Sequence, residues 1–566
     1  MSQIESPLVP CFLMIHPRTH RLIPIPVAFA ILLLGAAASA QEPTDPQESG
    51  LVEEVKVRLV TLTIYAIDDV GLPVTDLEPE ELVVHDGGDE VPVAFLDARE
   101  PLGDAEVTAR LYVDAPGGAT RPVSTFRGQP LFYVFLLDLV HEPMIDQEEA
   151  KRQLQEFVKY QFDGDELVAL LSFTGSINLE LPFTNDAGAL GKAVDAAYAR
   201  KRVPADDVVM RVRRLLTKLD MCRRGEDDEG VWICINQVAT SYLDEGRNIE
   251  LQFISVLEGA VDFTAGLSGR KSLVVLGQGA SINPELELNA AISSVMLTNY
   301  TGIREMDDYE FNLLVNKAIE RGVVVHFIAR SRHGPKNLTG AQYEFGANEI
   351  GGDPLRLAQE GAEEAMAIVA KDTGGVLIKD KDLTTGLQEV IELERSGYTL
   401  GYYLDEDPNR RKRQTLRKVK VSSRRKGVTI IAPKRYSVAA PLEQDIDVKL
   451  AVQQPLPGTE EGMWQIPFQI QADPQQIGYE VKKGVATANF IIETSVLQAD
   501  GRVVVRAFNF INHEYDRKEW KSGKTGPLAI DAWVELPTGD YEIKAVVSNY
   551  KAEHHGEATR RFKLAF

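Results

Sequence analysis

The spacing of hydrophobic and polar positions changes twice along the chain. From Val55 to Ile67 apolar and polar residues alternate, which is typical of a half-buried strand. The turns at 68–71 and 86–89 then separate short apolar runs, as in hairpins. After a Pro-, Glu- and Asp-rich linker at 41–50, residues 51–125 therefore predict a small N-terminal β domain.

From Leu131 the pattern becomes one of buried strands alternating with amphipathic helices. An apolar strand ends at Asp138, and residues 146–162 follow it with hydrophobic positions at helical spacing. Similar pairs continue as far as a strand near 376–378. Such alternation predicts parallel strands joined by right-handed crossovers, with helices on both faces. Residues 126–395 should therefore form a doubly wound α/β domain.

Strand patterns return at residue 396. Two strands, at 397–404 and 417–421, fall in a hairpin region and linker at 396–440. Because they follow the α/β segment, we expect them to complete the N-terminal β domain and make the α/β domain an insertion in a β-sandwich. Residues 441–566 alternate again and predict a C-terminal β-sandwich. The predicted fold class is thus α/β plus all-β, with the doubly wound domain flanked by or inserted in a β-sandwich.

The first forty residues carry an export signal. Arg18, His20 and Arg21 precede an apolar run from 22 to 37, and Ala38-Ser39-Ala40 supplies small residues for cleavage after Ala40. We therefore expect 1–40 to be a signal peptide and the protein to be secreted or periplasmic, with no membrane insertion after cleavage. The alternative is an uncleaved anchor, since the run approaches the roughly 20 residues that span a bilayer.

Composition and charge narrow the class of partner. Asp plus Glu number 84 and Lys plus Arg 61, a net charge of −23 that disfavours binding to nucleic acid or anionic membranes. The ten basic residues between Arg410 and Lys426 could bind a polyanion, but a solvated hairpin explains them as well. The sequence does not indicate an oligomeric state.

Cysteine usage agrees with export. Cys11 precedes the cleavage site, so the mature chain keeps only Cys222 and Cys234, an even number that suits an oxidising compartment. A disulfide between them would contribute about 3 kcal/mol. Two buried thiols are the alternative.

Five segments, in order, resemble bacterial exported proteins with a von Willebrand factor A-related domain. The resemblance covers about Val55–Tyr436. Its segments are the strand with Asp138, GDELVALLSFTG from Gly164, GLSGRKSLVVLGQG from Gly266, VAKDTGGVLIKDKDL from Val369, and SGYTLGYYL from Ser396 followed by RKVKV from Arg417. The resemblance implies an adhesion or protein-interaction module rather than a catalyst.

The same resemblance implies a place for a metal-ion-dependent adhesion site. Of the first-loop ligands only Asp138 matches, because Val140 and Glu142 stand at the other two places. The third-loop position falls near Gln278, which is not a carboxylate, and Thr240 is a weak match for the second loop. Since Mg²⁺ requires hard oxygen donors, we expect a degenerate site without metal or other cofactor.

The loops at the carboxyl end of the sheet are the predicted binding surface. They carry Asp138, His141, Glu142, Thr174 and Gln278, and we expect them to face a protein or cell-surface partner. Zinc-protease, nucleophile-elbow and phosphate-loop motifs do not occur in the sequence, so the prediction is a protein that is not an enzyme.

Two alternatives remain open. A divalent ion at Asp138 and Glu142 would make the chain a metal-dependent adhesin, and His141 would extend the choice to Zn²⁺ or Mn²⁺. Alternatively, Asp138, His141 and Glu142 would supply acid and base to an envelope hydrolase.

Overall fold

The computed structural model describes most of the chain from Val57 onward, and Val55–Phe566 forms one compact unit. The described residues are 57–98, 111–114, 120–122, 125–126, 130–141, 144–200, 208–225, 227–277, 279–280, 284–296, 309–329, 354–405, 416–437, 444–459, 461–482, 484–522, 526–549 and 554–564. The predicted signal peptide and linker lie outside them. Among the described helices, none is both long and apolar enough to cross a membrane.

The α/β segment is built on a six-stranded sheet of order β10-β9-β8-β11-β12-β13. The strands are β8 (Phe132–Asp138), β9 (Leu167–Phe173), β10 (Ile177–Thr184), β11 (Lys271–Leu276), β12 (Val323–Ala329) and β13 (Leu377–Lys379). Only the β9–β10 pairing is antiparallel. Every residue of β8, β9 and β11 is buried, which is why these strands read as unbroken apolar runs.

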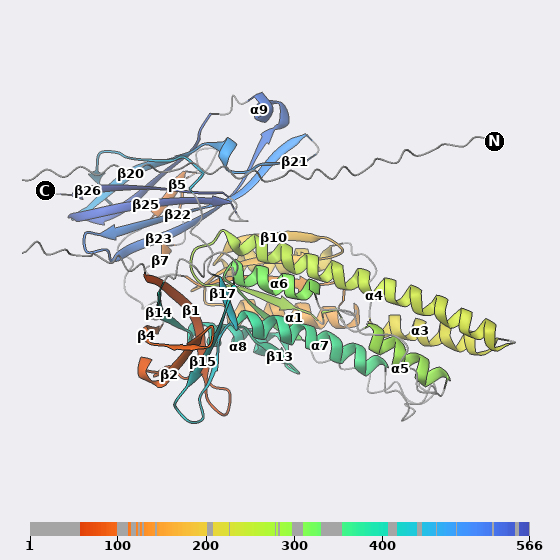
Figure 1. The fold of residues 1–566 in the computed structure, drawn as a ribbon. Helices are drawn as coiled ribbons and strands as arrows, with labels where there is room; N and C mark the ends of the chain where they lie inside the picture. Colours follow the sequence, from red (N-terminus) through yellow and green to blue (C-terminus); the bar gives the residue numbers. More distant parts are fainter. Residues whose placement is uncertain are drawn as a thin grey trace, which may run out of the picture. The chain divides into compact units, whose positions relative to one another are not determined.

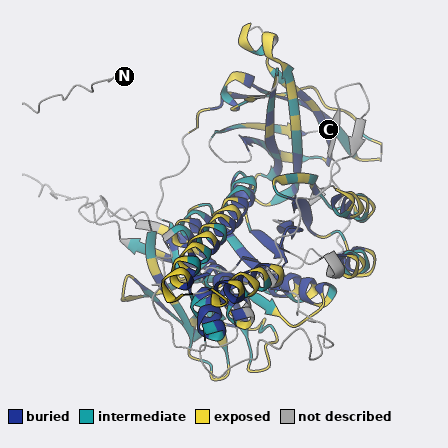
Figure 2. Cartoon of the chain, turned by 90° about the vertical axis from the view of Figure 1, so that its right-hand side faces the viewer, coloured by how far each residue is buried: buried dark blue, intermediate teal, exposed yellow. Residues whose placement is uncertain are grey.

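Helices cover both faces of this sheet (Figure 1). On one face α1 (Met144–Tyr160), α2 (Ala187–Ala199) and α8 (Leu383–Arg395) share a core with Tyr133, Phe135 and Leu137. On the other face α4 (Asp228–Ala265), α6 (Tyr309–Glu320) and α7 (Pro354–Thr373) pack on Phe132, Val134 and Leu136. Successive residues of β8 thus point to opposite faces, and Figure 2 shows the buried strands beneath helices with exposed outer sides.

A helical insertion separates β10 from β11. It contains α3 (Val208–Arg223) and the first half of α4, and α5 (Pro284–Met296) packs against them in a separate apolar core. α4 is one continuous helix that begins at Asp228, well before Ile249. The reason is that Asp227 caps the helix by accepting a hydrogen bond from the Gly230 N–H, and Val231, Ile235 and Ala239 extend its buried stripe. Cys222 and Cys234 are joined by a disulfide with a Cα–Cα distance of 5.5 Å.

Two four-stranded sheets enclose the core of the N-terminal β domain. One has the order β16-β1-β14-β4, and the other β17-β15-β2-β3. Their strands are β1 (Val57–Ile67), β2 (Leu82–Asp86), β3 (Asp89–Val91), β4 (Val93–Ala98), β14 (Tyr398–Asp405), β15 (Leu416–Ser423), β16 (Thr429–Ile431) and β17 (Arg435–Ser437). Because β4 and β14 pair although the α/β segment lies between them in sequence, the chain leaves this domain and returns to it.

The C-terminal region forms two further sheets around one core. The first has the order β18-β20-β24-β5-β6 with β19 beside β20, and the second β26-β25-β22-β23-β7 with β21 beside β22. Their later strands are β18 (Val448–Val452), β19 (Leu456–Pro457), β20 (Met463–Ala472), β21 (Glu480–Lys482), β22 (Val485–Gln498), β23 (Val503–Asp516), β24 (Leu528–Pro537), β25 (Gly539–Asn549) and β26 (His555–Leu564); α9 (Arg517–Ser522) follows β23.

One domain boundary differs from the prediction. We placed 51–125 in the N-terminal domain, but β5 (Leu111–Asp114), β6 (Thr120–Pro122) and β7 (Thr125–Phe126) belong to the C-terminal sheets. β5 pairs with β24, and β7 pairs with β23. Strands this short carry too few alternating positions to reveal which sheet they join.

Candidate functional site

The carboxyl ends of β8 and β11 meet at the point where the strand order of the α/β sheet reverses. From β8 the chain proceeds to β9 on one side and later to β11 on the other. In open α/β sheets ligands bind in the crevice at such a switch point. We call the described residues Asp138, Val140, His141, Thr174 and Gly277 the crown.

Both carboxylate oxygens of Asp138 are used within its own loop. Its Oδ1 accepts hydrogen bonds from the backbone N–H groups of Val140, at 3.3 Å, and His141, at 3.2 Å. Its Oδ2 lies 2.8 Å from His141 Nδ1, and the side chain of Asp138 is 1% exposed. The sequence therefore folds this loop around the aspartate as a turn in which the side chain replaces backbone acceptors.

The His141 side chain packs over the end of β8, next to Asp138, Phe173 and Phe253. Because a carboxylate only accepts, the Nδ1 atom must carry the proton that it shares with Asp138. The ring lies 5.9 Å from Phe173 at the end of β9 and 5.7 Å from Phe253 of α4, measured between centroids. The imidazole is 5% exposed, and its Nε2 has no hydrogen-bond partner among the described residues.

Gly277 is a crown residue that the sequence analysis missed. A Cβ at this position would lie 2.7 Å from the Asp138 Cβ, a distance that real side chains do not adopt. The ends of β8 and β11 can approach each other this closely only because residue 277 is glycine. The signal in the sequence was a glycine directly after a buried strand.

Thr174 and Thr240, the other candidate residues that the structure describes, make their side-chain hydrogen bonds with groups other than Asp138. Thr174 is buried, and its hydroxyl accepts a hydrogen bond from Asn178 Nδ2 at 3.0 Å. Thr240 lies on the exposed side of α4 and donates to the Asn236 carbonyl at 2.9 Å. Glu142 and Gln278 lie outside the described residues.

The described part of the crown does not fit a metal ion. Within the described residues, groups of three or more His, Cys, Asp or Glu side chains placed to hold a metal do not occur. Val140, which stands where a ligand would be needed, is buried and offers only hydrocarbon. Asp138 already accepts hydrogen bonds at both carboxylate oxygens, and the described part of the crown brings no further carboxylate or imidazole to it besides His141, whereas Mg²⁺ requires several hard oxygen donors.

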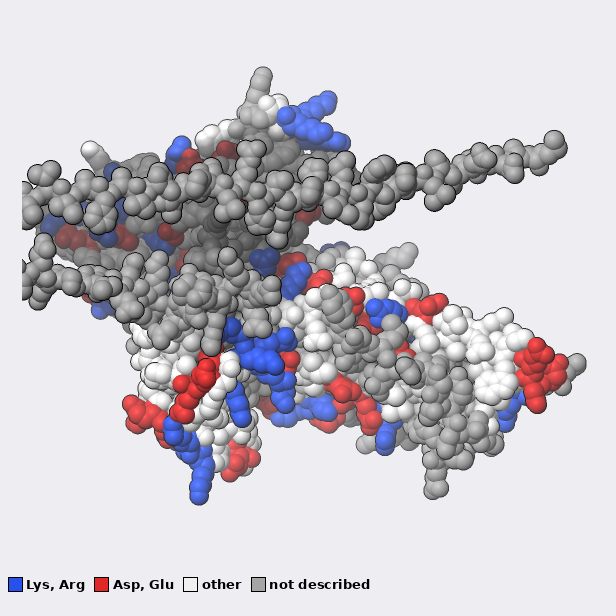
Figure 3. Space-filling view, viewed as in Figure 1, with Lys and Arg blue, Asp and Glu red and all other residues white. Residues whose placement is uncertain are grey.

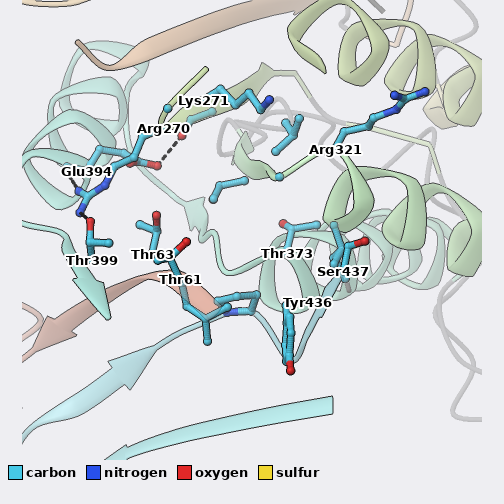
Figure 4. Close-up of a pocket in the computed structure, with 18 of the residues that line it drawn as sticks. Thr61, Thr63, Arg270, Lys271, Arg321, Thr373, Glu394, Thr399, Tyr436 and Ser437 are labelled. Atoms are coloured by element: carbon cyan, nitrogen blue, oxygen red, sulfur yellow. Dashed lines mark hydrogen bonds between the residues drawn. The ribbon is translucent and has the colours of Figure 1, made fainter. Parts of the chain in front are cut away.

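A cavity of about 900 Å³ lies at the opposite end of the sheet, where β1 and β14 face the start of β11 and the end of α6. Figure 4 shows Thr61 and Thr63 on one wall, while the Arg321 guanidinium points away from them. Arg270 donates to the Gly397 carbonyl at 3.0 Å and to Thr399 Oγ1 at 3.1 Å. Lys271 donates to two carbonyls, and its burial, together with Arg321, lowers its pKa to about 8. We assign no ligand to this cavity.

A buried network beside this cavity contains a serine, a histidine and a carboxylate. Ser272 donates to Glu394, and His326 Nε2 lies 2.8 Å from the same carboxylate. His326 Nδ1 accepts from the Val376 N–H, so Nε2 carries the proton. Burial alone would raise the pKa of Glu394, but the hydrogen bonds from His326 and Ser272 hold it below its usual value. The serine bonds the carboxylate rather than the histidine, so the set lacks the contact that activates a nucleophile.

Three arginines in the described part of the basic cluster pair with neighbouring carboxylates. Arg417 Nε donates to Asp86 at 2.7 Å, and Arg425 Nε donates to Glu81 at the same distance. Arg424 lies 3.2 Å from Glu90. Residues 410–413 lie outside the described part. These pairings favour a solvated hairpin over a polyanion site.

Comparison with known proteins finds solved structures that are similar to this chain at low sequence identity. No family model matches the chain, and no curated protein matches it. The chain is similar to the conserved hypothetical protein BatB from Bacteroides thetaiotaomicron, with 15% identity, a TM-score of 0.23 and coverage of 47% of this chain and 97% of that one. It is also similar to the vWF domain of the type V pili tip protein Mfa5 from Porphyromonas gingivalis, with 11% identity, a TM-score of 0.23 and coverage of 46% and 95%.

A longer fragment of Mfa5, its three N-terminal domains, covers 90% of this chain and 78% of its own length, at 10% identity and a TM-score of 0.22. Two of these three structures come from Mfa5, one of them its vWF domain, and all three similarities have low identity and low TM-scores.

Proposed function

We propose that this chain is an exported, non-catalytic protein-binding or adhesion protein with a degenerate metal-ion-dependent adhesion site. In this proposal a von Willebrand factor A-like domain is inserted in the N-terminal β-sandwich, and a C-terminal β-sandwich follows. The observation that carries the proposal is the Asp138 carboxylate, whose two oxygens both accept hydrogen bonds, from the His141 side chain and from two backbone N–H groups.

Because these hydrogen bonds hold Asp138 within its own loop, we expect the crown to recognise a partner by shape and polarity rather than through a metal ion. Both carboxylate oxygens of Asp138 accept hydrogen bonds within its own loop, which leaves few lone pairs for an ion that needs several hard oxygen donors. The partner is a protein or a cell-surface component that contacts the loops after β8, β9 and β11. The export signal expected at residues 1–40 supports an encounter in the periplasm or outside the cell.

We favour binding over hydrolysis because the imidazole of His141, which Asp138 orients, is buried. Asp138 positions His141 much as an acid positions a catalytic base, but Phe173 and Phe253 flank the ring. A general base must come within hydrogen-bond reach of the proton that it removes. Screening the purified protein against cell-wall polysaccharide and peptide substrates tests this choice, and turnover abolished by His141→Gln would contradict it.

The metal-free crown is tested by titrating the purified protein with MgCl₂ in a calorimeter. We expect no saturable heat and no rise in the thermal unfolding temperature, for the wild type and for Asp138→Asn alike. Asp165→Asn serves as the control, because Asp165 is exposed and precedes the opposite end of β9. Saturable binding by the wild type and the control, lost only in Asp138→Asn, would establish a metal-dependent adhesin instead.

A further inference from the structure

The hairpin of α3 and α4 ends in a tip that a disulfide holds together. Cys222 lies in the last turn of α3 and Cys234 in the second turn of α4, and the bond between them closes the connection that joins the helices. We define the tip as Met221, Asp227, Asp228, Glu229, Trp232 and Ile233. At about 1.5 Å per residue, the 38 residues of α4 reach from this tip to the core against the sheet.

The support beneath the tip is rigid. α3, α4 and α5 share their own apolar core, which includes Leu219, Ile235 and Ile292. Near its base Arg211 donates to Glu287 at 3.0 Å, and the Tyr242 hydroxyl donates to the same carboxylate. One buried carboxylate thereby joins all three helices. These contacts restrain the helices of the hairpin, so the backbone needs less ordering when a partner meets the tip, which favours binding.

The tip exposes large apolar side chains. Met221 is 60% exposed, Trp232 42% and Ile233 53%. On α4 the buried stripe runs through Val231, Ile235 and Ala239, and Ile233 lies on the far side of the helix from it. Ile233 therefore contributes nothing to the core of the hairpin. Tryptophan and methionine are enriched in protein interfaces, and buried tryptophans often dominate their binding energy.

Carboxylates border these apolar side chains. Asp228 stands four residues before Trp232 and Glu229 four residues before Ile233, so each acid shares a helix face with one apolar residue. Neither acid makes an ion pair within the described residues, whereas Arg223 and Arg224 are both paired with Asp220. Figure 3 shows acidic side chains gathered at the far end of the hairpin.

We propose that the tip is a docking surface for a protein partner that offers an apolar patch bordered by lysine or arginine. Charge complementarity selects this occupant, because Asp228 and Glu229 would repel an anionic lipid surface. A symmetric contact between two tips would place the same acids against their copies. The surface is separate from the crown, and the inference holds whether or not the crown binds a partner.

Selection from a random peptide library displayed on phage, with the full chain immobilised, tests the proposal. We expect the enriched peptides to combine apolar residues with lysine or arginine. A synthetic peptide of that consensus should bind Trp232→Ala and Ile233→Ala at least tenfold more weakly than the wild type, by fluorescence anisotropy. The double variant Asp228→Asn, Glu229→Gln should bind it more weakly and with less dependence on salt.

Two matched variants on the same helix control for general effects. Leu251 is exposed and apolar, and Asp244 is exposed and acidic, but both lie away from the tip. Leu251→Ala and Asp244→Asn should bind the peptide like the wild type, and all variants should keep its unfolding temperature. Peptides without basic residues, or equal binding by the tip variants, would overturn the proposal. It would also fall if Ile233→Asp abolished a dimer seen by light scattering, or abolished binding to phosphatidylglycerol vesicles.

Discussion

At the scale of single residues, the crown depends on the hydrogen bond between the side chains of Asp138 and His141. Asp138 is buried next to apolar strands, and a buried carboxylate requires hydrogen-bond donors to remain charged. His141 supplies the one side-chain donor observed among the described residues, and its ring covers the carboxylate between Phe173 and Phe253. The stability effects of substituting Asp138 and His141 should therefore be coupled.

Replacement of His141 by phenylalanine should destabilise the protein by about 1.5–3 kcal/mol, because Asp138 then loses a hydrogen bond to its charged group. Urea unfolding measures the loss. In a double-mutant cycle with Asp138→Asn, the two effects should differ from additivity by about 1 kcal/mol or more. Additive effects would mean that the Asp138–His141 contact does not hold the crown closed.

Substitution of Gly277 by alanine tests the close approach of β8 and β11. The new Cβ would lie 2.7 Å from the Asp138 Cβ, so we expect a loss of about 1–3 kcal/mol in urea unfolding. Gly259→Ala is the matched control, since this helical glycine has its nearest neighbour at 3.5 Å. That variant should be neutral or gain up to about 1 kcal/mol from helix propensity. Equal effects of the two substitutions would contradict the account.

At the scale of elements, Glu394 links the last helix of the α/β segment to strands β11 and β12. Its folded pKa lies below the ordinary value of 4.5, so the unfolded chain binds more protons between the two values. Its contribution to stability is therefore complete above about pH 4.5 and is lost as the pH falls through the folded pKa. Glu394→Gln should be less stable at pH 7 and should lose less stability on acidification.

Urea unfolding between pH 3 and 7 measures how steeply the free energy of unfolding changes with pH in the wild type and in Glu394→Gln. A Glu394→Gln slope equal to that of the wild type would show that the carboxylate titrates alike in both states.

The disulfide should stabilise the hairpin rather than the sheet. Replacing Cys222 and Cys234 together by serine removes a cross-link between residues 12 apart, worth about 3 kcal/mol in the chain-entropy model. We expect faster hydrogen exchange at the end of α3 and the start of α4, measured by mass spectrometry, with β8 and β9 unchanged. Faster exchange spread evenly over the sheet would contradict a local role.

At the scale of the whole molecule, the chain path is nested. It begins in the N-terminal β domain, contributes β5, β6 and β7 to the C-terminal sheets, builds the α/β segment, and then returns through β14 to pair with β4. The periodicity of the sequence predicted the long elements, because buried parallel strands such as β8 require unbroken apolar runs. Alternation also marked β14 and β15 as strands that follow the α/β segment.

The sequence did not reveal contacts that depend on local geometry. Nothing in the order of residues 138–141 shows that the imidazole turns back onto the carboxylate, since that depends on the loop conformation. β7, with only two residues, has no period to read. The exposed Ile233 also looks like an ordinary helical apolar residue until the buried stripe of α4 is known. Packing, rather than pattern, decides each of these cases.

Export is a property of the whole chain that fractionation can measure. Expressed in a bacterial host, the protein should appear in the periplasmic or secreted fraction with Gln41 as its first residue, as determined by mass spectrometry. A chain that keeps residues 22–37 and remains with the membrane fraction would show that this segment is an anchor.

The most direct test of the central claim is a crystal structure of the protein grown with MnCl₂, which replaces Mg²⁺ and scatters anomalously. The account predicts an anomalous map without a peak above β8, and His141 Nδ1 still within hydrogen-bond distance of the Asp138 carboxylate. A peak at about 2.1 Å from a carboxylate oxygen of Asp138, with the imidazole displaced, would contradict it.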